Sequence, residues 1–216
     1  MAKKFKHIFQ EVFEVQDFFR EPLLTLGYLP ILTKGWFGEF NQTKIKNYLT
    51  YEKSDITILD LFDPRAHLKL DLNLPVPESE HEKYQTIMDY GTLEHIFDTK
   101  QSLENCFRML KVGGLYFLHT PIRGYFRHGL HTFNPELILC ALKVNDFKIE
   151  FLKYSTRAGE VISAPSGGNE AGLTIHNRGT LIWVVARKTK PLDKFAVPQQ
   201  GMWSSYYDSV KGMEPK

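Results

Sequence analysis

Short apolar runs recur along the chain, separated by longer segments of mixed polarity. Runs of this kind, bounded by polar or turn-forming residues, predict buried β-strands. They occur at residues 23–26, 56–61, 67–72, 86–89, 115–119, 147–154 and 181–187. The run at 67–72 predicts only a short strand. Gly27 stops the first run, and Pro121 is expected to break the strand at 115–119.

Other segments place apolar residues at the spacing of one helix face. They are residues 7–20, 36–50, 103–110 and 135–143. Pro22 ends the first of these helices, because the residue before a proline disfavours helical geometry. Lys111, followed by Gly113 and Gly114, marks the end of the helix at 103–110.

Strands that alternate with helices predict an α/β fold with a mainly parallel sheet and right-handed crossovers. We expect one domain over residues 1–216, with its core at about 20–190 and a loose tail at 208–216. Residues 155–180 form a glycine-rich polar insertion, too long to be a plain turn. Ligands of such sheets bind at the carboxyl ends of the strands, so the residues found there are the candidates for a site.

Three residues that follow the first three strands are candidates for binding a nucleoside. Gly27 lets the backbone turn tightly and approach a ligand. Asp60 is suited to accept hydrogen bonds from both hydroxyls of a ribose, although a helix cap or a loop contact is an equal alternative. Asp71 could accept from the amine of an adenine, and its alternative is an Asx turn before Pro75.

Two longer motifs are more specific. The fourth strand ends in DYGTLEHIF at residues 89–97, and the helix that follows turns into the fifth strand through MLKVGGLYFLHTP at residues 109–121. These motifs, in this order and at this spacing, resemble those of the class I S-adenosylmethionine-dependent methyltransferases. DLNLP at 71–75 and HGLHTFNP at 128–135 resemble one branch of that family more narrowly.

The resemblance implies a Rossmann-like sheet of seven strands, mostly parallel, with helices on both faces and the last strand antiparallel. It implies S-adenosylmethionine as the cofactor. On the motif of this family, the cofactor-binding residues would include Asp89, Gly91 and His95, in addition to the three residues named above.

The chain departs from the family in its first loop. That loop is usually an acid followed by three glycines, whereas this chain has only Gly27 and a neutral residue in place of the acid. The aspartate usual early in the fourth strand is Gln85. Thr25 or the backbone of Gly27 would then have to anchor the amino-acid end of the cofactor.

Methyl transfer to a hydroxyl needs a base, and a histidine of near-neutral pKa suits that role. His128 and His119 are the expected catalytic residues, for acid/base work or for acceptor binding, and ordinary loop histidines are the alternative. Arg123, Arg127 and His131 are expected to bind substrate, since arginine can hold a phosphate or a carboxylate. For the arginines, together with Arg157, a solvated loop face is the competing interpretation.

Aromatic residues near both ends of the chain could close over the acceptor, although core packing is the alternative for each of them. They are Trp36, Phe37, Phe40, Trp203, Tyr206 and Tyr207. His128 and His131 form an HxxH that Glu94 could join as metal ligands, but this spacing is common by chance and we expect no metal site.

Composition narrows the functional class. The 216 residues include 27 basic and 25 acidic side chains, interspersed, for a net charge of +2, so no nucleic-acid partner is expected. Cys106 and Cys140 form no CxxC pair, which fits a cytoplasmic protein. No run of about 18 apolar residues predicts a membrane span, and no leader pattern precedes residue 20.

The leading hypothesis is a methyltransferase acting on an oxygen or nitrogen of a small polar metabolite, such as a sugar or a surface-glycan precursor. A homodimer is a further expectation. The alternative is a non-catalytic methyltransferase-like module that scaffolds a partner, motivated by the single Gly27 in the first loop. A nucleotide-binding oxidoreductase is disfavoured, because no GxGxxG follows the first strand.

Overall fold

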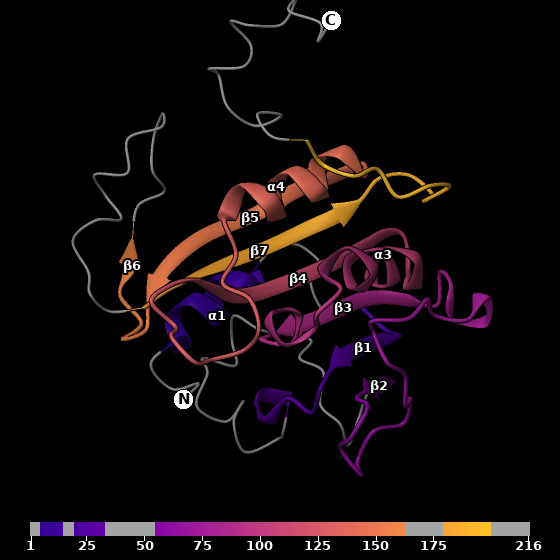
Figure 1. The fold of residues 1–216 in the computed structure, drawn as a ribbon, viewed down its shortest axis with the longest axis horizontal. Coiled ribbons are helices and arrows are strands. Elements are labelled where there is room, and N and C mark those ends of the chain that lie inside the picture. The colour runs from indigo at the N-terminus through magenta and orange to yellow at the C-terminus, as the bar shows by residue number, and fades with distance from the viewer. Residues whose placement is uncertain (1–4, 15–19, 33–54, 163–178, 200–216) are drawn as a thin grey trace, which may run out of the picture.

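The computed structural model describes residues 5–14, 20–32, 55–162 and 179–199. These residues form one mixed sheet whose strands lie in the order β2-β1-β3-β4-β7-β5-β6 (Figure 1). The strands are β1 (Leu23–Leu26), β2 (Ile56–Leu59), β3 (Tyr84–Tyr90), β4 (Leu110–Arg123), β5 (Phe147–Thr156), β6 (Val161–Ile162) and β7 (Thr180–Lys188).

Strand direction confirms the expected fold class. β1 pairs in parallel with both β2 and β3, and β3 pairs in parallel with β4. β7 runs antiparallel to its neighbours β4 and β5, so the last strand is reversed, as the resemblance implied. The parallel strands β1, β2 and β3 therefore end at the same edge of the sheet.

The prediction of a third strand at residues 67–72 is wrong. Pairing there is limited to one isolated bridge between Leu59 and Leu68. It stops because β2 ends at Leu59, where the Asp60 carboxylate accepts from the amides of Phe62 and Asp63 and turns the chain. The count of seven strands is instead completed by β6, a short antiparallel addition to β5 in the predicted insertion.

Pro121 does not break the strand that contains it, contrary to expectation. β4 continues through it to Arg123, with one register shift between these residues. A proline interrupts a sheet only where its missing N–H is needed by a neighbouring strand. β3 ends at Tyr90, which pairs with His119, so β4 has passed its parallel neighbour before it reaches the proline.

Helices cover both faces of the sheet, as predicted. Side chains of α1 (Lys6–Glu14) pack with Phe117 and Trp183 on one face. Side chains of α3 (Thr99–Met109) and α4 (Pro135–Val144) pack with Tyr116 on the other. Neighbours along a strand point to opposite faces, so Phe117 and Tyr116 belong to different cores.

The two well-capped helices confirm the expected segments, α4 with the predicted start at Pro135 and α3 with an earlier start. The Asp98 carboxylate accepts from the Gln101 amide at 2.8 Å and caps α3, which begins four residues before the predicted helix. The sequence did not predict this first turn because it is polar and shows no apolar spacing. Asn134 caps α4 in the same way through the Glu136 amide at 2.9 Å. The predicted helix at 36–50 lies outside the described residues.

Three short 3-10 turns complete the described elements: η2 (Pro30–Leu32), η3 (Glu78–Glu80) and η4 (Leu93–His95). Within the described ranges, the helices are too short or too polar to span a bilayer.

Lys188, at the end of β7, caps the carboxyl end of α3 from across the sheet. Its Nζ donates to the carbonyls of Phe107 at 2.9 Å and Leu110 at 2.7 Å, and it lies 3.3 Å from Glu82 Oε1. The side chain is 1% exposed, and this burial lowers the pKa of Lys188 below its ordinary value. The last carbonyls of a helix have no partner within the helix, so this amine supplies one.

Lys188→Met should lower the free energy of unfolding by roughly 2 kcal/mol, because it leaves the two buried carbonyls without their donor. Lys190→Met is the matched control. Lys190 is 66% exposed and pairs only with the surface residue Asp146, so its loss should cost less than about 1 kcal/mol. Urea unfolding of both variants measures the difference, and equal losses would contradict the capping role.

Candidate functional site

The carboxyl ends of β1, β2 and β3 bring together Gly27, Asp60 and Thr92. Gly27 has a φ of +79° and donates its amide to the Leu59 carbonyl at 2.8 Å. A Cβ placed on Gly27 would lie 3.8 Å from both Asp60 Oδ2 and Thr92 Oγ1. The missing side chain therefore leaves backbone bordered by a carboxylate and a hydroxyl, which can approach a polar ligand closely.

Asp60 uses one oxygen to hold its own loop. Oδ1 accepts from the amides of Phe62 at 2.8 Å and Asp63 at 2.9 Å, so the loop contact considered from the sequence is present. Oδ2 has no hydrogen bond among the described residues and is the oxygen nearer to Gly27. The second oxygen thus remains available to accept from a ligand.

Asp71 forms the Asx turn that was its alternative interpretation. Its Oδ1 accepts from the Asn73 amide at 2.9 Å and from the Asn73 side chain at 2.8 Å. The hydrogen bond from the Asn73 amide is the largest cause of the lowered pKa of Asp71. This turn orients the segment that leads away from the edge of the sheet.

Asp89 lies inside the protein instead of facing a ligand. Its carboxylate accepts from the amides of Thr92 at 2.9 Å and Leu93 at 3.3 Å, and from the Tyr116 hydroxyl at 3.2 Å. The side chain is 0% exposed, and this burial, followed by the nearby charge of Glu94, raises the pKa of Asp89 to about 7. Asp89 therefore shapes the loop after β3, and its contact with a cofactor stays a prediction.

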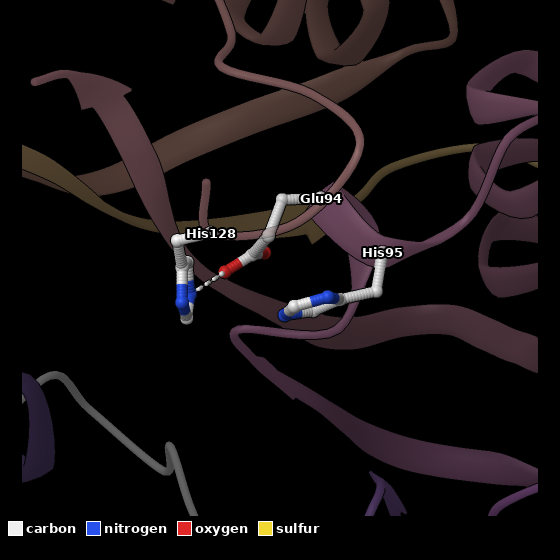
Figure 2. A group of neighbouring side chains, drawn as sticks. All are labelled: Glu94, His95 and His128. Carbon is white, nitrogen blue, oxygen red and sulfur yellow. Dashed lines mark ion pairs between the residues drawn. The ribbon is translucent and has the colours of Figure 1, made fainter. Parts of the chain in front are cut away.

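Glu94, His95 and His128 form a second polar group beside that loop. Figure 2 shows the Glu94 carboxylate and the two imidazoles pointing toward one another. One nitrogen or oxygen of each residue lies within 4.8 Å of the corresponding atoms of the other two. Glu94 Oε1 is 3.5 Å from His128 Nε2, and Oε2 accepts from the Thr120 hydroxyl at 3.0 Å. Glu94 is buried, whereas both histidines are exposed.

Main-chain hydrogen bonds fix the position of His128. The Glu94 carbonyl accepts from the amides of Leu130 at 2.7 Å and His131 at 3.0 Å, which seats the loop after β4 on η4. Gly129 makes this close approach possible, since a Cβ there would lie 2.8 Å from the Glu94 carbonyl oxygen. Gly91 also borders the Glu94 side chain, since a Cβ there would lie 3.3 Å from Glu94 Oε1.

Comparison with known proteins gives a partial match in sequence. No family model matches the chain. A curated protein of Mycolicibacterium smegmatis, named a probable S-adenosylmethionine-dependent methyltransferase, is 28% identical over 90 residues. The matched segment covers 40% of this chain and 34% of that relative, so the chain corresponds to only about a third of the relative's length.

Solved structures match over most of the chain. A chain of the complex between the Haloferax volcanii Trm112 methyltransferase activator and a methyltransferase has a TM-score of 0.50 at 13% identity, covering 88% of this chain and 92% of that one. The match to a SAM-dependent methyltransferase from Archaeoglobus fulgidus has a TM-score of 0.47 at 14% identity and covers 87% of this chain and 97% of that one. The chain has the class I methyltransferase fold.

Within this methyltransferase fold, His119 points to the face opposite Glu94. It packs against Tyr90 and Trp183, with ring centroids 4.3 Å and 4.1 Å away. The residue is 7% exposed, and burial lowers the pKa of His119 to about 3. Such a weak base is poorly suited to remove a proton near neutral pH, so the structure disfavours His119 relative to His128 as the acid/base residue.

The residues expected to bind substrate lie in different local environments. His131 is held by its Nε2, which lies 3.1 Å from the Phe97 carbonyl. Arg123 and Arg127 are exposed on the loop side of β4, and Arg157 lies over the Tyr125 ring at 5.6 Å. That these side chains bind substrate stays a prediction.

Thr92 and Thr120 were missed in the sequence, although both follow predicted strands, at 86–89 and 115–119; in the structure Thr120 lies within β4. Thr92 Oγ1 donates to the Leu26 carbonyl at 2.9 Å and joins the ends of β1 and β3. A search of every polar residue after a strand, beyond acids and histidines, would have found both. The aromatic residues expected to close the site, at 36, 37, 40, 203, 206 and 207, lie outside the described residues.

Asp89→Asn tests the buried carboxylate, because it removes the titration with little change in shape. The folded pKa of about 7 lies above the ordinary 3.8, so the folded state holds more protons between these values. The free energy of unfolding of the parent should therefore fall as pH rises through this window, by roughly 1 kcal/mol per pH unit relative to the variant.

Urea unfolding at several pH values across this window measures that slope. Asp146→Asn is the control, because Asp146 is exposed and pairs with Lys190 on the surface. If the free energy of unfolding depends on pH in the same way in the parent and in Asp89→Asn, the pKa of Asp89 is not raised in the folded protein.

Proposed function

We propose that the protein transfers a methyl group from S-adenosylmethionine to an oxygen or nitrogen of a small polar metabolite, of which a sugar or a surface-glycan precursor is the leading example. The observation that carries this proposal is the group formed by Gly27, Asp60 and Thr92 at the carboxyl ends of adjacent strands in a methyltransferase fold. Ligands of such sheets bind at this edge.

The residues at this edge fit the cofactor on their own chemistry. Asp60 Oδ2 is an acceptor without a partner among the described residues, as needed for the two donors of a ribose diol. Gly27 presents backbone instead of a side chain beside it, so a single glycine leaves room at the point of closest approach. Asp71 is assigned to the adenine amine through its second oxygen, because the first is used by Asn73.

The bound cofactor supplies a methyl group on a positively charged sulfur, so the protein has to orient the acceptor and manage its proton. We assign His128 to the acceptor side, either to take this proton or to bind the acceptor. It is exposed, and its Nε2 faces the buried Glu94, which Thr120 holds from behind. A histidine oriented by a carboxylate is a common arrangement in acid/base catalysis.

Calorimetry with S-adenosylhomocysteine tests the cofactor assignment. The parent should bind it, and Asp60→Ala should weaken binding by roughly tenfold, as expected for the loss of a charged hydrogen-bond acceptor. Asp193→Ala is the control, since Asp193 is exposed and distant in sequence from the strand ends that form the site. Its affinity should equal that of the parent.

Absence of any binding by the parent at about millimolar S-adenosylhomocysteine would contradict the enzyme proposal. That result would favour the scaffold alternative, for which the reduced first loop around Gly27 is the supporting observation.

His128→Ala should lower methyl transfer by roughly 100-fold while leaving S-adenosylhomocysteine affinity unchanged, because the residue acts on the acceptor side. Transfer from radiolabelled S-adenosylmethionine to a panel of sugars and sugar nucleotides gives the measurement. His7→Ala, on the exposed side of α1, is the control histidine. Normal transfer by His128→Ala would place the acid/base residue elsewhere.

A further inference from the structure

We propose that Glu94, His95 and His128 bind a divalent transition-metal ion of the zinc, manganese or cobalt class. Two neighbouring residues of η4 supply two of the ligands, and the loop after β4 supplies the third (Figure 2). The sequence offered only the HxxH of His128 and His131, with Glu94, and no metal site was expected from it. The structure separates these two, because His131 Nε2 lies against the Phe97 carbonyl.

The distances suit an ion placed between the three side chains. Their candidate ligand atoms lie within 4.8 Å of one another. Metal–ligand bonds to nitrogen and oxygen are about 2.0–2.2 Å long, so ligands around one ion are separated by no more than roughly 4.4 Å. Small rotations of the two exposed imidazoles are enough to close the remaining difference.

The charge at this place also favours a cation. Glu94 is 1% exposed and lies near the buried Asp89, and a buried carboxylate is costly unless a positive charge or full hydrogen bonding compensates it. Among the described residues, neither carboxylate forms an ion pair with lysine or arginine. Glu94 Oε2 is satisfied by Thr120, whereas Oε1 has only His128 Nε2 at 3.5 Å.

The site is held in shape before any ion binds. The two amides that donate to the Glu94 carbonyl fix the loop of His128 relative to η4, and Gly129 permits that contact. The Thr120 hydroxyl orients the carboxylate itself. Hydrogen bonds of this kind, made to a metal ligand from behind, set its direction and support affinity.

The identity of the ligands selects the class of metal. Two imidazoles and one carboxylate suit zinc and the other first-row divalent ions better than calcium or magnesium, which prefer oxygen ligands alone. Because His95 and His128 are exposed, the solvent side of the ion would stay open. Resting on the proposed function, we assign these open positions to oxygen atoms of the methyl acceptor, so that His128 takes the second of its two proposed roles and binds the acceptor through the ion.

Titration of the chelator-treated full chain with Co²⁺ tests the site without using the cofactor. We expect saturable binding of one ion per chain with visible ligand-field absorption. His95→Ala, His128→Ala and Glu94→Gln should each weaken binding by at least roughly tenfold. His7→Ala controls for non-specific imidazole binding and should match the parent.

Circular dichroism of each variant shows whether it is folded. Because His95 and His128 are exposed, their variants decide the test even if Glu94→Gln unfolds. Absence of Co²⁺ absorption in the parent, or affinity equal to the parent in either histidine variant, overturns the metal site. S-adenosylhomocysteine calorimetry tests the methyltransferase proposal separately, so either one can fail while the other stands.

Discussion

The turn closed by the buried Asp89 carboxylate is the constraint on which the whole strand-end region depends. The Asp89 side chain accepts hydrogen bonds from two amides of the loop after β3 and from the hydroxyl of a tyrosine in β4. These bonds fix that loop on the sheet. On one side of the turn, Thr92 reaches the end of β1 beside Gly27. On the other, Glu94 and His95 are presented to the loop after β4. The proposed cofactor and acceptor regions are therefore positioned by the same buried group.

Side-chain alternation along β4 divides its polar residues between the two faces of the sheet. His119 enters an aromatic cluster with Tyr90 and Trp183 and becomes a weak base through desolvation. Thr120, the next residue, faces the other way and holds Glu94. One step along the strand thus separates an aromatic packing environment from the candidate site, and this explains why two histidines that look equivalent in the sequence differ in chemistry.

The sequence predicted the positions of the main strands and of the helices α3 and α4, because these depend on local apolar patterns, and the resemblance to a known family supplied the reversed last strand. It failed where pairing decides the outcome. Residues 67–72 alternate like a strand, but their neighbour β2 has already turned at Asp60, and Pro121 is tolerated because β3 has already ended. The sequence also could not predict that His95 lies beside His128, because main-chain contacts between two loops bring these residues together.

The loop after β4 is attached to η4 through its backbone, while two of its large side chains face outward: Phe126 is 93% exposed and Leu130 is 64% exposed. Substitution at these positions leaves the peptide hydrogen bonds intact, so His128 keeps its place while the surface around it changes. Evolutionary drift, or deliberate library design, can therefore alter which molecules reach this region without rebuilding its framework. The same attachment makes Gly129 the position of the loop that is least free to vary.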